Sequence, residues 1–374
     1  MTLRERFSAL DPVITWMTLG LTLVGLIVLM SASGPIAFQR TGDGFYYVKH
    51  QLLSGVLPGL VLFLALALID MRRWKKFALF FLIISIGLLS LVYLPGVGVT
   101  VNGARGWIDI ASLRFQPSEL VKITFLIYLS AWLSERKGSD AHDPHTGLLP
   151  FLISVGTVML LLVLQPDTGS MGVIVGMSVL LYFASGAPIA WFAGLCAAGL
   201  GFLWMLIKLS PYRAARFMTF MHPELDPKGI GYHINQAYLA IGTGGWFGVG
   251  YGHSRQKFLY LPEVESDSVI AIFAEEMGLV VLVGLLIAFG VLIWRCLKIS
   301  REHRDRFASF IALGVGCWLG IQIFMNIGSM AGLIPITGVT LPFFSHGGSA
   351  MTVMLGAMGM VAGLPSLNTK RERL

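Results

Sequence analysis

The sequence predicts an all-α integral membrane protein with about ten transmembrane helices. Hydrophobic residues make up 55% of its 374 residues and charged residues only 13%, whereas soluble domains carry about 25% charged residues. The apolar runs are also long, and a helix needs about 20 predominantly apolar residues to cross a bilayer. Most of the chain is therefore expected to contact lipid rather than water.

Ten apolar runs fit this length, and each is expected to form one spanning helix. They cover residues 12–33, 51–70, 75–95, 117–135, 148–165, 169–186, 188–209, 268–294, 307–330 and 342–364. The first run is long enough to span and lacks a small-residue cleavage motif, so we interpret it as a helix and not as a cleaved signal peptide. We expect one polytopic domain over 1–374, with a long extracytoplasmic loop, 210–267, between the seventh and eighth helices.

The basic residues predict the orientation of these helices. The net charge of +7 does not indicate nucleic-acid binding, because most basic residues lie in short loops between apolar runs, where they orient a protein in the bilayer. With both termini in the cytoplasm, 16 of the 27 basic residues fall in cytoplasmic segments and span ends. They are Arg4, Arg6, Arg72, Arg73, Lys75, Lys76, Arg136, Lys137, Arg295, Lys298, Arg301, Arg304, Arg306, Lys370, Arg371 and Arg373. Loops 96–116, 166–168 and 210–267 then lie outside.

Several common site types have no motif in the sequence. Cys196, Cys296 and Cys317 form no CxxC pair, so neither a zinc site nor a disulfide framework is indicated. Walker, HExxH and GxSxG motifs are also lacking. Any energy for group transfer must then come from the substrate.

The outside loop 210–267 contains a glycine-rich apolar stretch, residues 229–252. We expect a short interfacial or re-entrant segment there. Irregular backbone at membrane depth requires burial in protein or contact with water.

A first group of polar residues surrounds the start of the fourth helix. Asn102–Trp107 is followed by Arg114, Gln116, Glu119 and Lys122. Glu119 and Lys122 are three residues apart and share one helix face. They could form an ion pair that satisfies itself, or Lys122 could line a polar cavity with Arg105 or Arg114 at its mouth, which would suit a phosphate ligand.

Acidic residues mark two further places. Asp167, in the turn Gln165–Ser170, could cap the sixth helix and also pair with the basic residues above. Asp267 stands at the start of the eighth helix, where capping is again the simpler interpretation. Glu275 and Glu276 follow inside the apolar run, and we expect at least one to pair with Lys122 or an arginine.

The entry to the last helix is bent by Pro342 and by Gly347-Gly348, and it follows Asn326 of the ninth. Ser345 and Ser349 offer hydroxyl groups there. His346 is either a hydrogen-bonded structural residue or a base.

Together these motifs resemble the SEDS family (shape, elongation, division and sporulation proteins), which includes FtsW and RodA. The matching stretches are NGARGWI with FQPSELVKI, the QPDTGS turn, AIGTGGWFGVGYGHSRQKFLYLPEVESDSVIAIFAEEMG and GLIPITGVTLPFFSHGGSAM. The stretch SASGPIAFQRTGDGFYYVKHQL is more similar to FtsW than to RodA. Two positions depart from the family pattern: Glu265–Ser268 replaces His-Thr-Asp-Phe, and Ser345–Gly348 reads Ser-His-Gly-Gly instead of Ser-Tyr-Gly-Gly.

The resemblance implies a peptidoglycan glycosyltransferase in the bacterial cytoplasmic membrane. It would join lipid II units into glycan strands on the outer face and work with a class B penicillin-binding protein. The family's essential aspartate falls on Asp267, and its cavity residues fall on Arg114, Gln116, Glu119, Lys122 and Asp167. We also expect Arg105, Trp107, Glu276 and Ser345 to bind substrate.

The implied chemistry is inverting glycosyl transfer, with Asp267 as the general base. Lys122 and Arg105 or Arg114, with Arg213 or Arg216, would stabilise the pyrophosphate leaving group. A divalent cation (Mg²⁺ or Mn²⁺) could accompany the substrate, although the sequence displays no dedicated metal site. A lipid II flippase and a non-catalytic scaffold for the penicillin-binding protein are the alternatives.

Overall fold

The computed structural model describes residues 3–101, 104–110, 113–136 and 142–365. Six residues used in the predictions lie outside the described residues: Asn102, Gly103, Lys137, Lys370, Arg371 and Arg373.

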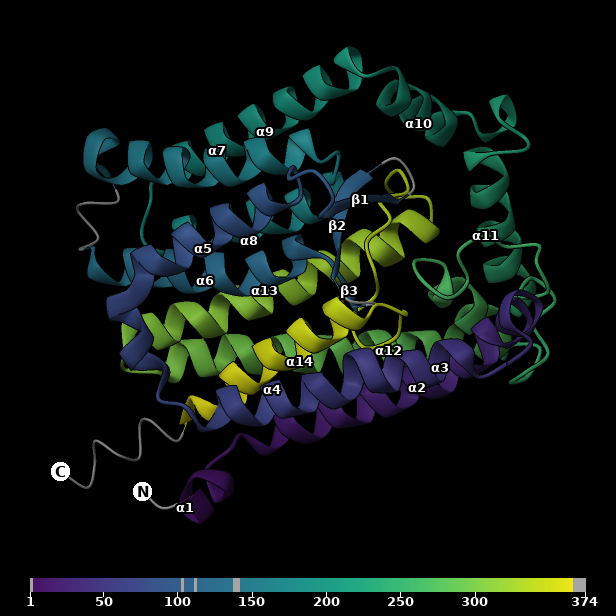
Figure 1. The fold of residues 1–374 in the computed structure, drawn as a ribbon, viewed down its shortest axis with the longest axis horizontal. Coiled ribbons are helices and arrows are strands. Elements are labelled where there is room, and N and C mark those ends of the chain that lie inside the picture. Colours follow the sequence, from purple (N-terminus) through teal and green to yellow (C-terminus); the bar gives the residue numbers. More distant parts are fainter. Residues whose placement is uncertain (1–2, 102–103, 111–112, 137–141, 366–374) are drawn as a thin grey trace.

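The protein is a bundle of long helices, and the first and last described helices, Leu3–Ser8 and Gly348–Gly363, reach the same end of it, called here the terminal end (Figure 1). Within the described residues, seven helical stretches are long and apolar enough to cross a membrane: Pro12–Thr41, Tyr46–Leu68, Met71–Leu91, Pro144–Leu164, Ile189–Leu209, Val269–Glu302 and Arg306–Met330. Thr168–Ala184 and Gly348–Gly363 are apolar but shorter, and Pro117–Glu135 carries Glu119 and Lys122. These ten helices match the ten predicted spans, so the chain is a multi-pass membrane protein.

The elements follow in this order: α1 Leu3–Ser8, α2 Pro12–Thr41, α3 Tyr46–Gln51, η1 Leu52–Val56, α4 Leu57–Leu68, η2 Met71–Phe77, α5 Ala78–Leu91, β1 Gly98–Val101, β2 Ala104–Ile110, β3 Leu113–Phe115, α6 Pro117–Glu135, η4 Pro144–Leu148, α7 Leu149–Leu164, α8 Thr168–Ala184, α9 Ile189–Leu209, α10 Pro211–Met221, η5 Pro223–Leu225, α11 Ile230–Gly244, α12 Val269–Glu302, α13 Arg306–Met330 and α14 Gly348–Gly363.

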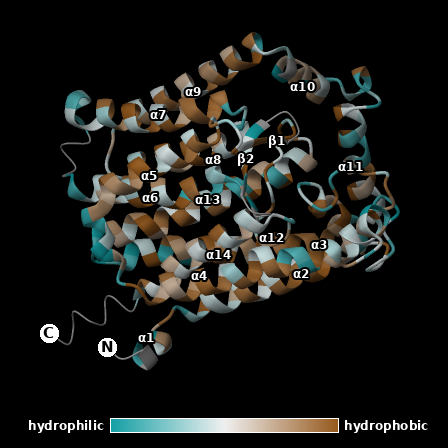
Figure 2. Cartoon of the chain, viewed as in Figure 1, coloured by the Kyte–Doolittle hydropathy of each residue, from teal (hydrophilic) through white to brown (hydrophobic). Residues whose placement is uncertain are grey.

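Local sequence signals begin several of these helices. Asp11 accepts a hydrogen bond from the Ile14 N–H at the start of α2, and Asp305 accepts one from the Ala308 N–H at the start of α13. Such caps satisfy N–H groups that have no partner within the helix. Hydrophobic residues cover the helix lengths, and hydrophilic ones gather toward the two ends (Figure 2). This banding is what a bilayer requires.

Helix packing differs strongly across the bundle. In α13 most side chains are buried, whereas Leu206 is the buried residue of α9, which lies at the periphery. α14 packs closely on α4 through small residues. A Cβ on Gly359 would lie 2.3 Å from the Phe63 carbonyl oxygen. Small residues let membrane helices approach this closely.

A small antiparallel sheet was not expected from the sequence. It has the order β1-β2-β3, with Val99 opposite Trp107 and Ile108 opposite Phe115. Its strands are short and precede α6 directly. Together with α10 and α11, it lies toward the end of the molecule opposite the terminal end (Figure 1).

Candidate functional site

The predicted base, Asp267, lies in the turn before α12 and is 5% exposed. Its burial, and next the nearby charge of Glu263, raise the pKa of Asp267 to about 7. The residue at the N-cap of α12 is Ser268, which makes no side-chain capping bond, so the capping interpretation of Asp267 was wrong. The carboxylate is therefore available for another role.

Asn326 of α13 holds the backbone of this turn. Its Nδ2 donates to the Asp267 carbonyl oxygen at 2.9 Å and to the Val339 carbonyl oxygen at 2.8 Å. Asn326 is fully buried. One amide thus joins the start of α12 to the loop that leads into α14.

Asp167 does cap α8, as one interpretation predicted. Its Oδ1 accepts from the Ser170 N–H at 2.9 Å, while Oδ2 accepts from Gln116 Nε2 at 3.1 Å and from Ser118 Oγ at 2.9 Å. The Gln116 N–H donates to Ser349 Oγ at 3.2 Å. The structure thus brings Gln116 and Asp167 together and links them to the start of α14.

Glu119 and Lys122 form the ion pair that was one of the two predicted alternatives, although the buried Glu119 Oε2 has no hydrogen-bond partner among the described residues. Lys122 Nζ is 2.7 Å from Glu119 Oε1 and 3.3 Å from Gln322 Oε1, and it lies 5.6 Å from the centre of the Trp318 ring. Lys122 is 1% exposed. It does not line an open cavity in this structure, because α6 and α13 enclose it.

Arg105, Trp107 and Arg114 lie on the small sheet. Arg105 and Trp107 are two residues apart on β2 and so share one face of it. Arg114 is exposed and lies 3.2 Å from Asp109 Oδ2 on the neighbouring strand. Arg105 approaches the Leu94 carbonyl oxygen at 3.5 Å. The sheet therefore presents two arginines at the same end of the molecule as Asp267.

Ser345 and His346 lie in the loop before α14, and hydrogen bonds hold both residues in place. Ser345 Oγ accepts from the Leu341 N–H at 2.8 Å, and the His346 N–H donates to the Glu265 carbonyl oxygen at 2.7 Å. His346 Nε2 lies 3.0 Å from His50 Nδ1. Burial lowers the pKa of His346 to about 4, so its ring is neutral at physiological pH. This arrangement is that of the structural histidine, one of the two predicted alternatives.

The prediction that Glu275 or Glu276 pairs with Lys122 or an arginine was wrong. Glu276 pairs with Lys257 instead. Lys257 Nζ is 2.8 Å from Glu276 Oε1, and Ser31 Oγ of α2 donates to the same carboxylate at 2.7 Å. Glu275 accepts from Ser254 Oγ and from the Arg255 N–H. Both acids therefore fasten the 254–257 segment to α12.

α12 is broken at Gly278, whose φ of 76° lies in the left-handed region. The loop after α11 fills this break with backbone hydrogen bonds. The Val249 N–H donates to the Glu275 carbonyl oxygen at 3.0 Å, and the Leu279 N–H donates to the Gly245 carbonyl oxygen at 2.9 Å. Residues 229–252 thus form a helix followed by an irregular loop whose backbone is bonded to α12, while side chains such as Trp246 and Phe247 are exposed. The interfacial or re-entrant segment expected there stays a prediction.

Three contacts near Asp267 were not predicted from the sequence. Arg40 of α2 pairs with Glu265 at 2.9 Å, and His233 Nε2 of α11 lies 2.6 Å from Ser268 Oγ. The charge of Arg216 in α10 acts on both His233 and Asp267. Arg216 was considered only as a phosphate ligand, and no local pattern marks Arg40 or His233.

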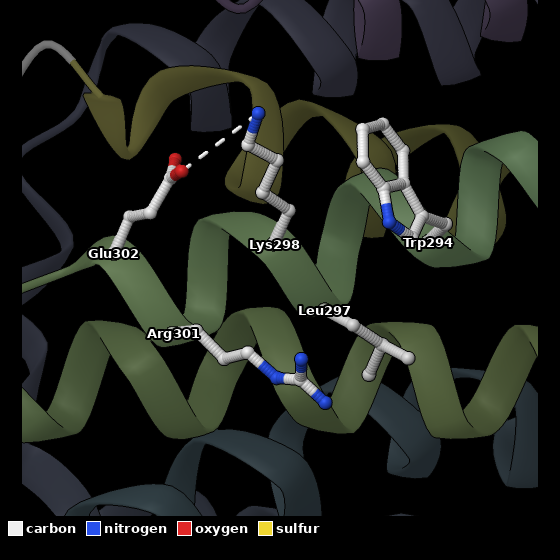
Figure 3. Close-up of a pocket in the computed structure, with 5 residues that line it drawn as sticks. All are labelled: Trp294, Leu297, Lys298, Arg301 and Glu302. Atoms are coloured by element: carbon white, nitrogen blue, oxygen red, sulfur yellow. Dashed lines mark ion pairs between the residues drawn. The ribbon is translucent and has the colours of Figure 1, made fainter.

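Two cavities lie near the opposite end of α12. One, of about 170 Å³, is lined by Trp294, Leu297, Lys298, Arg301 and Glu302, with Lys298 paired to Glu302 (Figure 3). The other, of about 480 Å³, lies beside it and shares Leu297 and Arg301. At 1.5 Å per helical residue they are roughly 40 Å from Asp267. The two cavities are therefore not part of the site around Asp267.

No group of three or more His, Cys, Asp or Glu side chains that could hold a metal ion occurs in the described part of the chain. The divalent cation considered above therefore stays a prediction that concerns the substrate.

These observations define a class: a multi-pass membrane protein with a buried acid and several arginines gathered opposite the terminal end. The chain belongs to the SEDS family. The model for this family of FtsW, RodA and SpoVE proteins, described as cell cycle protein, matches residues 12–370.

Individual relatives cover nearly the whole chain. Stage V sporulation protein E of Bacillus subtilis is 38% identical over 351 residues, which are 94% of this chain and 95% of the relative. A protein of Halorhodospira halophila named probable peptidoglycan glycosyltransferase FtsW is 38% identical over 355 residues, 94% of this chain and 89% of the relative. These similarities confirm the FtsW-like character predicted from the sequence.

Solved structures share the fold. A chain from a peptidoglycan synthase complex, described as coordinating polymerization and crosslinking, superimposes with a TM-score of 0.78 at 28% identity and covers 96% of this chain and 98% of that one. The rod shape determining protein RodA of Thermus thermophilus gives a TM-score of 0.70 at 26% identity, over 96% and 97% of the two chains.

Proposed function

We propose that the protein is a peptidoglycan glycosyltransferase that polymerises lipid II at the outer face of a bacterial cytoplasmic membrane. The names of its FtsW relatives support this activity. The observation that carries the proposal is Asp267, a buried carboxyl group with a pKa of about 7 in the turn before α12. A general base works best when its pKa lies near the operating pH.

In this reaction the 4-hydroxyl of one sugar attacks the anomeric carbon of a second sugar. A new C–O bond forms with inversion, and the bond to the lipid pyrophosphate breaks, so that the pyrophosphate leaves with the electron pair. Asp267 accepts the proton of the attacking hydroxyl. Base catalysis of this kind contributes about 10²–10⁴-fold to a rate.

The leaving group needs positive charge. Arg105 and Arg114 on the sheet and Arg216 beside Asp267 can supply it, because guanidinium groups bind phosphate oxygens well. Lys122 is enclosed with Glu119, so we assign this role to the arginines first. A Mg²⁺ or Mn²⁺ ion bound to the pyrophosphate would add to the same charge stabilisation.

Orientation and partners follow from the same proposal. The distribution of basic residues supports an orientation with both termini in the cytoplasm, in which Asp267 lies outside. Lipid II is then donor and acceptor, and membrane lipids surround the helices. The similarity to a chain of a peptidoglycan synthase complex supports a class B penicillin-binding protein as partner.

The test is polymerisation of labelled lipid II by purified protein, with and without the partner. Asp267→Asn keeps the shape of the side chain but removes the base, so we expect the rate to fall by about 10²–10⁴-fold. Glu224→Gln, an exposed carboxylate in the loop between α10 and α11, is the matched control and should leave the rate unchanged. A near-normal rate in Asp267→Asn would refute the assignment.

The flippase and scaffold alternatives predict other outcomes. A flippase would move lipid II across vesicle membranes without forming polymer, and Asp267→Asn would still move it. A scaffold would leave polymerisation to its partner. The purified chain alone would then form no polymer, and the complex carrying Asp267→Asn would polymerise like the wild-type complex.

A further inference from the structure

We propose that His233 and Ser268 are positioning residues for the Asp267 carboxylate, forming a hydrogen-bonded chain that runs from α11 to the base. The inference rests on the proposed function, in which Asp267 accepts the proton of the attacking hydroxyl. His233 Nε2 lies 2.6 Å from Ser268 Oγ, and Ser268 Oγ lies 3.5 Å from Asp267 Oδ1. The second distance is long, as catalytic hydrogen bonds often are before substrate binds.

Burial makes these contacts matter. Ser268 is fully buried and Asp267 is 5% exposed, so water does not readily replace a missing donor. A buried carboxylate without hydrogen-bond donors is costly to ionise. The hydroxyl of Ser268 is a donor next to this carboxylate, and it lowers the pKa of Asp267 against the opposing effect of burial.

The protonation state of His233 sets the direction of the chain. Burial, and next the charge of Arg216, lower the pKa of His233 to about 4, so the ring is neutral and carries one hydrogen. If that hydrogen is on Nε2, it is donated to Ser268 Oγ. Ser268 then directs its own hydrogen to Asp267 Oδ1. This order gives the ionised acid a charge-assisted hydrogen bond.

The groups around the hydrogen-bonded chain come from three elements: α10, the loop before α12, and α13. The charge of Arg216 in α10 acts on both Asp267 and His233, and it favours the ionised acid and the neutral imidazole. Glu263, in the loop before α12, opposes ionisation of Asp267. Asn326 of α13 fixes the Asp267 carbonyl oxygen. His233 and Ser268 therefore complete a set of contacts that holds both the backbone and the side chain of the base.

The experiment measures kcat/KM for polymerisation of labelled lipid II across about pH 5 to 9, in the full chain with its partner. Ser268→Ala and His233→Ala should move the acidic limb of the profile upward by about one pH unit. Ser268→Ala removes the donor to the ionised acid, and His233→Ala removes the contact that orients this donor. Ser268→Thr keeps the hydroxyl, and His233→Gln places an amide N–H near the former Nε2. Both should restore the wild-type limb.

His222→Ala removes an exposed histidine that lies beside Glu224 and should leave the profile unchanged. An unmoved limb in Ser268→Ala would overturn the inference, and so would a His233→Gln profile like that of His233→Ala. If Ser268→Ala does not fold, the two His233 variants decide. An active Asp267→Asn would instead refute the proposed function itself.

Discussion

Lys257 Nζ lies 2.8 Å from Glu276 Oε1, with the Lys257 side chain 5% exposed and that of Glu276 3% exposed. The two residues are 19 apart in the sequence, and the pair fastens the loop after α11 to α12. A buried charge left without its partner is costly, so this contact makes a direct prediction about stability.

Lys257→Met should lower the free energy of unfolding by about 3–5 kcal/mol, because Glu276 would stay buried without its cation. Thermal unfolding in detergent measures the change. The double variant Lys257→Met/Glu276→Gln should recover part of the loss. The exposed pair Lys49–Asp43 is the control, and Lys49→Met should unfold close to the wild-type temperature. Equal effects of Lys257→Met and Lys49→Met would contradict the prediction.

Gly278→Ala should destabilise the break in α12 and the loop that packs into it. Its φ of 76° disfavours any residue with a side chain, and a Cβ there would lie 2.3 Å from the Gly248 nitrogen. We expect a lower unfolding temperature and faster proteolysis of the 245–257 loop. Gly284→Ala, further along α12 with nothing within 4 Å of the added Cβ, should be neutral or stabilising.

Asp267→Asn should lose most of its activity but be more stable than the wild type at alkaline pH. The pKa of Asp267 is raised from 3.8 to about 7, so the folded state binds this proton more tightly than the unfolded state. The associated stability is complete below about pH 4 and is lost as the pH rises through about 7, by about 4 kcal/mol at most. Melting temperatures of the two proteins should converge as the pH falls to about 4. A constant difference would contradict this linkage.

Arg114→Gln and Arg105→Gln test where the pyrophosphate binds. Removing a cation that stabilises a developing charge costs about 10²–10³-fold in rate, so the arginine that contacts the leaving group should show a loss of this size in kcat. Arg73→Gln, an exposed arginine in η2 at the other end of the bundle, is the control. If neither sheet arginine matters, the assignment to the sheet is wrong.

Much of the fold was predictable because bilayer thickness sets the length of each spanning helix, and this length can be read from one continuous apolar run. The run 117–135 coincides with α6, and the capping role of Asp167 follows from its place before a helix. The small sheet was missed, because its strands are short and span length was the basis of prediction. The break in α12 was missed as well, since Gly278 lies in a continuous apolar run.

The sequence identified many residues of the site, but it did not predict most of the contacts between them. The structure joins Gln116 to Asp167 and Glu119 to Lys122, as the sequence allowed. It pairs Glu276 with Lys257 instead of the cations that were considered. Nothing in local spacing identifies such partners, because packing between distant segments decides them. The contact between His233 and Ser268 is of the same kind, because these two residues are 35 apart in the sequence.

The contacts of α2 have a consequence for how the protein is made. Its polar residues Asp11, Ser31 and Arg40 find their partners in Arg295, Glu276 and Glu265, and Ser31 precedes Glu276 by 245 residues. At a synthesis rate of about 5–20 residues per second, that interval is roughly 12–50 seconds. During it the first helix sits in the membrane without these long-range partners. We therefore expect it to stay beside the insertion machinery, or next to another protein, until the eighth helix arrives.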